Sequence, residues 1–300
     1  MTTRTTLVAR GVRGIAGVSP DAAAAIALRL FMRVGPRDRV REDATATMDA
    51  AQRSSVPVRG LGRTPVDVVV YTWGKGESTV ALTHGWGGRA SQFAPLVRDL
   101  VSEGFRVVAF DAPAHGESGG RRTYLFDWLD ALRGIQDRDG DLHAVIGHSF
   151  GALATLLAVV DGVRAERVVT VAAPADADVM LAQFRTALGY DDTVAAALRE
   201  RFAWRFLPPA ADPFARISAA SRPLPQGVPL VVVHDEEDRQ VPFGEAVRLT
   251  TAHPGARLVA TTGFGHGRIL RSDAFLDAAL EAVAAPAAPA WAASRDRTVA

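Results

Sequence analysis

Residues 147–151, Gly-His-Ser-Phe-Gly, contain the side chain of this sequence that is best placed for nucleophilic chemistry. An apolar run of strand type, 142–146, precedes the pentapeptide, and a run of good helix formers, 152–158, follows it. A serine on a sharp turn between strand and helix has its Oγ lifted clear of the backbone, and glycines without a Cβ let the two elements approach closely. The G-x-S-x-G pattern therefore predicts that Ser149 is a nucleophile, with a chance glycine-serine loop as the alternative.

A serine nucleophile requires a base, because its hydroxyl is a weak nucleophile at neutral pH. Three of the seven histidines follow Ser149, namely His234, His253 and His266. His266 is flanked by glycines and comes after the apolar run 257–260, so a loop after a late strand can carry it across the edge of a sheet. His234 directly follows an apolar run and is expected to pack at a strand end, whereas His253 beside a proline indicates a surface turn. We therefore predict that His266 is the base, with a solvated loop histidine as the alternative.

A carboxylate is expected between the serine and the histidine along the chain, because a third group must orient the imidazole. Four consecutive acidic residues follow the apolar run 228–233: Asp235, Glu236, Glu237 and Asp238. We predict that Asp238 is the orienting acid, since it lies on the loop after a strand, where such groups collect. Asp235, Glu236 and Glu237 remain rivals, although each is more typical of a solvated loop charge.

Two backbone N–H groups are candidates for an oxyanion hole, which stabilises the negative charge that forms on an attacked carbonyl oxygen. Phe150 directly follows the serine and is predicted to donate one N–H. Trp86 is predicted to donate the other, because the glycine-rich segment 84–88 follows the apolar run 79–83 and can fold tightly. A plain glycine-rich turn is the alternative for that segment.

These motifs resemble those of the α/β-hydrolase family of serine esterases, lipases and relatives over roughly residues 64–284. The resemblance rests on five segments: 84–87, 110–118, 147–151, 234–242 and 265–266. It implies a catalytic triad in the chain order Ser149, Asp238, His266, which works without a metal or an organic cofactor.

The resemblance also implies that Asp111 and His115 have structural roles. The chain departs from the family pattern at two positions, because the family often has glycine where Ala114 and Asp235 stand. The departure at Asp235 leaves the choice between this residue and Asp238 open.

Strand-type and helix-type runs alternate along the chain, which predicts an α/β fold with a mostly parallel, doubly wound sheet of α/β-hydrolase type. The alternation is interrupted at 176–222, which we predict to be a small helical cap. The predicted division is therefore an N-terminal helical extension (1–60), a hydrolase core (61–175 and 223–285), the cap (176–222) and a flexible tail (286–300).

The predicted cap carries aromatic residues at helical spacing, and its place in the chain puts it over the carboxyl edge of the sheet. We predict that Phe184 and Phe202 bind substrate by lining an acyl or other hydrophobic pocket. Alternatively, these aromatics only pack the insertion onto the core.

The extension contains a helix start at Ser19 and Pro20, followed by an apolar run, 22–32, that is interrupted by Arg29. The run is too short and too interrupted to span a bilayer, and Arg29 also argues against a signal peptide. We therefore predict a helix packed on the hydrolase body, with contact to a membrane surface as the less favoured alternative.

The composition fits a globular enzyme with a small-molecule substrate. Three hundred residues with 48% hydrophobic content can bury a large core, and a net charge of +1 argues against nucleic acid as a partner. The absence of cysteine excludes disulfides, a thiol nucleophile and a cysteine-ligated metal. We predict a cytoplasmic location, and the sequence leaves the oligomeric state open.

The sequence as a whole predicts a serine hydrolase that cleaves a carboxylic ester through an acyl-enzyme, with no cofactor. Thioester, lactone, peptide or carbon–carbon bond cleavage would use the same residues, so the fold does not choose among them. An alternative of another class is a non-catalytic, ligand-binding protein with the same fold.

Overall fold

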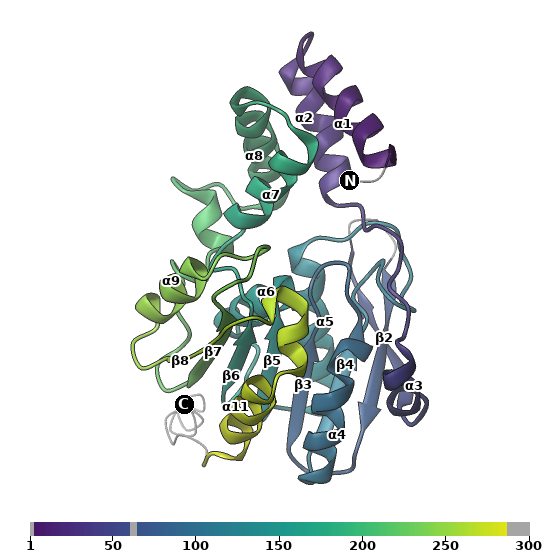
Figure 1. Ribbon diagram of the computed structural model, residues 1–300, viewed down its shortest axis with the longest axis vertical. Helices are drawn as coiled ribbons and strands as arrows, with labels where there is room; N and C mark the ends of the chain where they lie inside the picture. The colour runs from purple at the N-terminus through teal and green to yellow at the C-terminus, as the bar shows by residue number, and fades with distance from the viewer. Residues whose placement is uncertain (1–2, 61–64, 287–300) are drawn as a thin grey trace, which may run out of the picture.

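An eight-stranded sheet runs through the structure, a computed structural model in which residues 3–60 and 65–286 are described (Figure 1). In order across the sheet, the strands are β1 (Gln52–Val58), β2 (Val66–Trp73), β4 (Arg106–Phe110), β3 (Thr79–Thr83), β5 (Ala144–His148), β6 (Val168–Val171), β7 (Leu230–Asp235) and β8 (Arg257–Thr261). β2 pairs antiparallel with both β1 and β4, whereas the other pairs are parallel. The segments that follow β5, β7 and β8 therefore meet at one edge of the sheet.

Helices cover both faces of the sheet. One layer consists of α4 (Ala94–Ser102) and α11 (Asp273–Ala284), with α3 (Glu42–Asp49) beside α4, and the other of α5 (Leu125–Asp139), α6 (Phe150–Val160) and α9 (Gly244–Ala252). Side chains of β3 alternate between the layers, because Ala81 packs with α5 and α6 while Val80 and Leu82 pack with α4 and α11. Short helices complete the connections: η1 (Ala90–Phe93), α10 (Gly265–Arg268) and η3 (Ile269–Arg271). The prediction of an α/β fold with a mostly parallel, doubly wound sheet is confirmed.

The sheet begins earlier in the chain than the sequence division places it. β1 pairs with β2 along its whole length, so residues 52–58 belong to the core and not to a separate extension. The first four residues of β1, Gln-Arg-Ser-Ser, are exposed at the edge of the sheet. An edge strand of this kind lacks the apolar pattern by which buried strands are recognised.

The segment 176–222, between β6 and β7, is helical. It contains α7 (Asp178–Leu188), α8 (Asp192–Phe206) and the 3-10 helix η2 (Pro213–Ile217). α7 ends at Gly189, whose φ of 66° favours glycine, and α8 begins at Asp191, whose side chain accepts the Val194 N–H at 3.0 Å. These two helices project beyond the carboxyl edge of the sheet (Figure 1).

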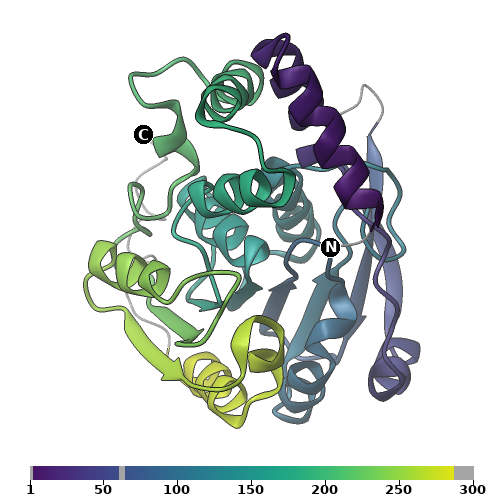
Figure 2. The same cartoon turned by 45° about the horizontal axis from the view of Figure 1, so that its top comes forward.

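The helical extension packs on these cap helices. α1 (Thr3–Ala16) and α2 (Pro20–Phe31) form a hairpin that lies beside α7 and α8 (Figure 1, Figure 2). The contact between α2 and α8 is made by small and apolar side chains: Ala23, Ala24, Ala27, Val194 and Leu198. The expectation that the N-terminal helix packs on the hydrolase body is therefore corrected: its main partner is α8, and the C-terminal end of α2 reaches the body.

The apolar run 22–32 forms most of α2, with Ser19 accepting the Ala22 N–H as its N-cap. Within residues 3–60 and 65–286, no helix combines the length and apolar character needed to cross a membrane. The predicted tail, 286–300, lies outside the described residues apart from its first residue.

Asp127 is a fully buried acid in the first turn of α5. Its Oδ2 accepts hydrogen bonds from the Thr123 hydroxyl (2.7 Å) and the Tyr124 N–H (3.3 Å), whereas its Oδ1 has no partner in the described part of the chain. Burial raises the pKa of Asp127 to about 7, although these hydrogen bonds oppose the rise. The folded protein therefore keeps a proton that the unfolded chain has already lost.

We expect Asp127→Asn to gain stability relative to the wild type as the pH rises. Between its ordinary pKa of 3.8 and about 7, Asp127 ionises in the unfolded chain while it stays protonated in the fold, so wild-type stability falls. The fall is at most about 4 kcal/mol, because each pKa unit corresponds to about 1.4 kcal/mol. Asparagine keeps an acceptor oxygen and does not titrate. Urea unfolding of both proteins at pH 4 to 8 measures the difference, and a difference independent of pH would contradict the raised pKa.

Candidate active site

Ser149 lies in the turn between β5 and α6, in a backbone conformation that strains any residue with a Cβ (φ 54°, ψ −125°). A Cβ at Gly147 would lie 2.5 Å from the Cα of Ala152. A Cβ at Gly151 would lie 2.3 Å from the carbonyl oxygen of His84. Both flanking positions therefore require glycine, which is the physical reason for the pentapeptide.

A continuous chain of hydrogen bonds links Ser149 to His266 and Asp238. The His266 Nε2 lies 2.9 Å from the Ser149 Oγ, and its Nδ1 lies 2.7 Å from the Asp238 Oδ2. Because an ionised carboxylate only accepts, Nδ1 carries the proton and Nε2 accepts from the serine hydroxyl. An imidazole in this tautomer is able to remove a proton from the serine.

Asp238 follows β7 and is buried. Its Oδ1 accepts the N–H groups of Gln240 (2.7 Å) and Val241 (3.0 Å), which leaves Oδ2 for His266. Burial raises the pKa of Asp238, but the hydrogen bonds from His266 and the two backbone N–H groups outweigh burial and hold the pKa below its ordinary value. The carboxylate is therefore ionised at neutral pH and can stabilise a positively charged imidazole.

Asp235, the rival acid, bonds to different groups. Its Oδ2 accepts the Thr261 hydroxyl (2.8 Å) and the Phe264 N–H (3.0 Å), and its Oδ1 accepts the Glu237 N–H (3.1 Å). Burial raises the pKa of Asp235, but the hydrogen bonds from Thr261 and from the backbone of Gly265, Phe264 and Glu237 together lower it. The carboxylate ties the segment that carries His266 to the end of β7, which is a structural task.

The remaining acids and histidines of the prediction do not contact the serine. Glu236 and Glu237 are exposed on the loop after β7. His234 and His253 are buried, and their rings bond to the carbonyl groups of Val241 and of α9. The surface position predicted for His253 is therefore wrong. Among the described residues, no cluster of three or more histidine, aspartate or glutamate side chains could hold a metal ion.

The loop after β3 packs directly against the serine. A Cβ at Gly85 would lie 2.9 Å from the Cβ of Ser149, so only glycine permits this approach. In the described part of the chain, the N–H groups of Trp86 and Phe150 have no acceptor. Both groups can therefore donate to an oxygen that becomes negatively charged at the serine.

Two buried histidines hold this loop in place. His84 accepts the Ala112 N–H at its Nε2 (2.9 Å). His115 accepts the Gly87 N–H at its Nε2 (2.9 Å). Burial lowers the pKa of both, to about 3 for His115, so each is neutral at pH 7 and able to accept. Asp111 accepts an N–H at the start of η1 (2.8 Å), so both Asp111 and His115 have structural contacts of the kind the resemblance implies.

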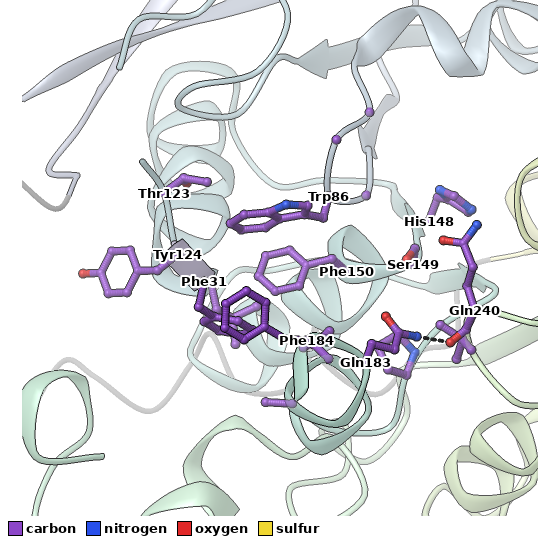
Figure 3. A pocket seen from close by; sticks show the side chains of 18 of the residues that line it. Phe31, Trp86, Thr123, Tyr124, His148, Ser149, Phe150, Gln183, Phe184 and Gln240 are labelled. Atoms are coloured by element: carbon purple, nitrogen blue, oxygen red, sulfur yellow. Dashed lines mark hydrogen bonds between the residues drawn. The ribbon is translucent and has the colours of Figure 1, made fainter. Parts of the chain in front are cut away.

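A cavity of about 550 Å³ opens between the serine turn, the cap and the end of α2 (Figure 3). One part of its wall is aromatic: Phe31, Trp86, Tyr124, Phe150, Phe184 and Phe202. The other part carries amides, because Gln240 lies on the side of Ser149 away from the aromatic rings and Gln183 lies next to Gln240 (Figure 3). The side-chain amide of Gln183 donates to the backbone carbonyl of Gln240, which links α7 to the loop that carries Asp238. The cavity is therefore apolar on one side of the serine and polar on the other.

The family model described as the alpha/beta hydrolase family matches residues 80–285, which is more than half of the chain. The chain belongs to the alpha/beta hydrolase family. Similar solved structures share the fold of this α/β-hydrolase at low sequence identity. An esterase from Pyrococcus furiosus has a TM-score of 0.57 and 19% identity, with 83% of this chain and 95% of that chain covered.

Two further relatives extend the comparison. A bromoperoxidase from Bacillus anthracis has a TM-score of 0.56 and 18% identity, and the match covers 76% of this chain and 98% of that chain. A serine hydrolase-like protein from Dictyostelium discoideum is 28% identical over 106 residues, which are 32% of this chain. The α/β-hydrolase spans only 29% of that relative's length. These likenesses show the fold and do not specify a substrate.

Sequence reasoning about this α/β-hydrolase missed several cavity residues. Phe31 and Met32 come from the N-terminal hairpin, more than a hundred residues before the serine. His148, inside the pentapeptide, packs its ring 4.9 Å from that of His266, and its Nε2 donates to the His266 carbonyl at 2.9 Å. Burial lowers the pKa of His148 to about 3, so it braces the His266 backbone as a neutral ring. The position of His148 next to Ser149 in the sequence could have indicated that its side chain lies at the site.

Proposed function

We propose that this α/β-hydrolase cleaves a carboxylic ester of a small molecule through an acyl-enzyme formed on Ser149. The observation that carries the proposal is the hydrogen-bond chain from Ser149 through His266 to Asp238, which opens into a largely apolar cavity. Such a chain supplies a nucleophile, a base and an orienting acid together. The cytoplasmic location remains a prediction from the sequence alone.

The proposed reaction has two halves. The Ser149 Oγ attacks the acyl carbon while its proton passes to the His266 Nε2, and the carbonyl oxygen takes the negative charge. The N–H groups of Trp86 and Phe150 stabilise that charge. Collapse breaks the bond to the alkoxy oxygen, which leaves as an alcohol with the proton from His266. Water then attacks the acyl-enzyme, again giving a proton to His266, which returns it to Ser149 as the acid is released.

The two sides of the cavity support a substrate orientation. The aromatic side, which includes Phe184 and Phe202, would bind an apolar acyl group, because contact with these rings removes methylenes from water. The amides of Gln183 and Gln240 would face the leaving alcohol, since they offer hydrogen bonds to its polar groups (Figure 3). Thioester, lactone, peptide and carbon–carbon bonds would use the same nucleophile, and no contact in the cavity favours one of them over an ester.

We expect a fluorophosphonate probe to label the native protein on Ser149. The serine oxygen would attack phosphorus and displace fluoride, because the same base and oxyanion donors assist that reaction. Peptide mapping by mass spectrometry locates the label, and heat-unfolded protein serves as the control that should stay unlabelled. Absence of labelling in the native protein would favour the non-catalytic, ligand-binding alternative, and turnover of aryl esters by the labelled protein would contradict the role of Ser149.

A further inference from the structure

The end of α2 brings an aromatic ring from the N-terminal hairpin into the wall of the cavity. The ring centroid of Phe31 lies 5.2 Å from that of Phe184 and 6.2 Å from that of Phe202, with edge-to-face geometry in both pairs. All three side chains line the cavity. In Figure 3 the rings of Phe31 and Phe184 lie beyond the ring of Phe150 as seen from Ser149. Phe31 therefore stands at the part of the cavity remote from the nucleophile.

The chain that follows Phe31 is fixed to the body of the molecule. The carbonyl of Met32 accepts the Thr123 N–H at 3.0 Å, and Arg33 forms a β-bridge with Arg122. Farther on, the Arg37 Nη2 donates to the Ser118 carbonyl at 2.7 Å. These contacts hold the end of α2 against the segment that leads into α5, which itself lines the cavity.

The other end of α2 is held by the cap. Its alanine face packs on α8, and Arg201 of α8 pairs with Asp21 in the first turn of α2 at 3.5 Å. α2 is thus attached to the cap along its length and to the body at its end. Phe31 lies where these two attachments meet, so its ring cannot leave the cavity without disturbing one of them.

We propose that Phe31 is a specificity-determining residue that closes the acyl side of the cavity and limits the length of the acyl chain. This inference rests on the proposed ester hydrolysis. An acyl chain attached to Ser149 would pass the rings of Phe150 and Phe184, and a longer chain would then meet Phe31. The Phe31 ring is held by contacts of the following residues with the segment that leads into α5, whereas Phe184 and Phe202 belong to the cap. Two separate parts of the chain therefore form this wall of the cavity.

Changing the size of this side chain should shift the preference for chain length. Phe31→Ala removes the ring and makes room for further methylenes, each of which contributes roughly fourfold in kcat/KM when it is buried. We expect the ratio of kcat/KM for p-nitrophenyl dodecanoate to that for the butyrate to rise on the order of tenfold or more. Phe31→Trp should lower the same ratio.

Leu28→Ala is the matched control. Leu28 lies one turn earlier on α2 and packs, like Phe31, against the apolar core, but it does not line the cavity. Leu28→Ala should lower the melting temperature as Phe31→Ala does, but its ratio of kcat/KM for the dodecanoate to that for the butyrate should equal the wild-type ratio. If Phe31→Ala lowers kcat/KM by one factor for every ester, or if Leu28→Ala shifts the ratio equally, Phe31 only packs the hairpin and the proposal is overturned.

A second measurement separates this inference from the proposed function. Calorimetric titration of Ser149→Ala with butyrate, octanoate and dodecanoate, in the presence and absence of Phe31→Ala, needs no turnover. We expect Phe31→Ala to increase the affinity for dodecanoate relative to octanoate. If the wild type hydrolyses no ester but this shift in affinity is seen, the proposed reaction is wrong while the role of Phe31 in limiting chain length is supported. If esters are hydrolysed and Phe31→Ala changes neither the kcat/KM ratio nor the affinities, the role of Phe31 is wrong while the proposed reaction is supported.

Discussion

Ser149→Ala is expected to abolish ester hydrolysis while leaving the protein folded. Removing the nucleophile from a triad of this kind lowers kcat by about a million-fold. The Oγ makes its hydrogen bond to His266 at the wall of a cavity, so its loss should change the free energy of unfolding by about 1 kcal/mol. Initial rates with p-nitrophenyl butyrate and thermal unfolding of both proteins measure the two effects. Retained turnover in this variant would remove Ser149 from the mechanism.

Ser149→Gly tests the strain at the same position. Both variants lack the hydroxyl, but the backbone at Ser149 has φ 54° and ψ −125°, a conformation that only glycine adopts without strain. Ser149→Gly should therefore be inactive like Ser149→Ala yet unfold at a higher temperature. Equal or lower stability of the glycine variant would show that the turn is not strained.

The fold and the turn that carries Ser149 were predictable because their signals are local. The glycine at 147 is needed within one turn of the chain, where a Cβ would overlap the Ala152 Cα. The alternation of buried strands and amphipathic helices likewise repeats over short windows. These patterns indicated the sheet, and the order along the chain indicated which serine, acid and histidine meet at its edge.

Other features depend on packing between distant segments. β1 is polar at its exposed start and becomes a strand only by pairing with β2. Phe31 enters the cavity because α2 packs on α8, and nothing in the sequence near Phe31 specifies that partner. In each case the missing information lies in a contact made far along the chain.

Asp238→Asn should lower kcat by about ten thousand-fold, the cost of losing the orienting carboxylate in a well-studied triad. The N–H groups of Gln240 and Val241 both point at Oδ1, so the asparagine oxygen should occupy that position. Its NH₂ then faces the His266 Nδ1, which must accept and leaves the proton on Nε2. An imidazole with a proton on Nε2 cannot take one from Ser149. Steady-state kinetics, with thermal unfolding as a check on folding, measure this loss.

Asp235→Asn and Glu236→Gln are the matched comparisons on the same loop. Glu236 is exposed, so its substitution should leave both rate and stability unchanged. Asp235 accepts hydrogen bonds on both oxygens, from Thr261, Phe264 and Glu237, and the NH₂ of an asparagine would face one of these donors. We expect Asp235→Asn to lower the free energy of unfolding by about 1–3 kcal/mol, with a far smaller loss of kcat than Asp238→Asn. A carboxylate that only holds β7 to the segment carrying His266 should affect stability more than proton transfer. If Asp235→Asn instead loses most of its kcat at unchanged stability, and Asp238→Asn stays active, Asp235 is the orienting acid.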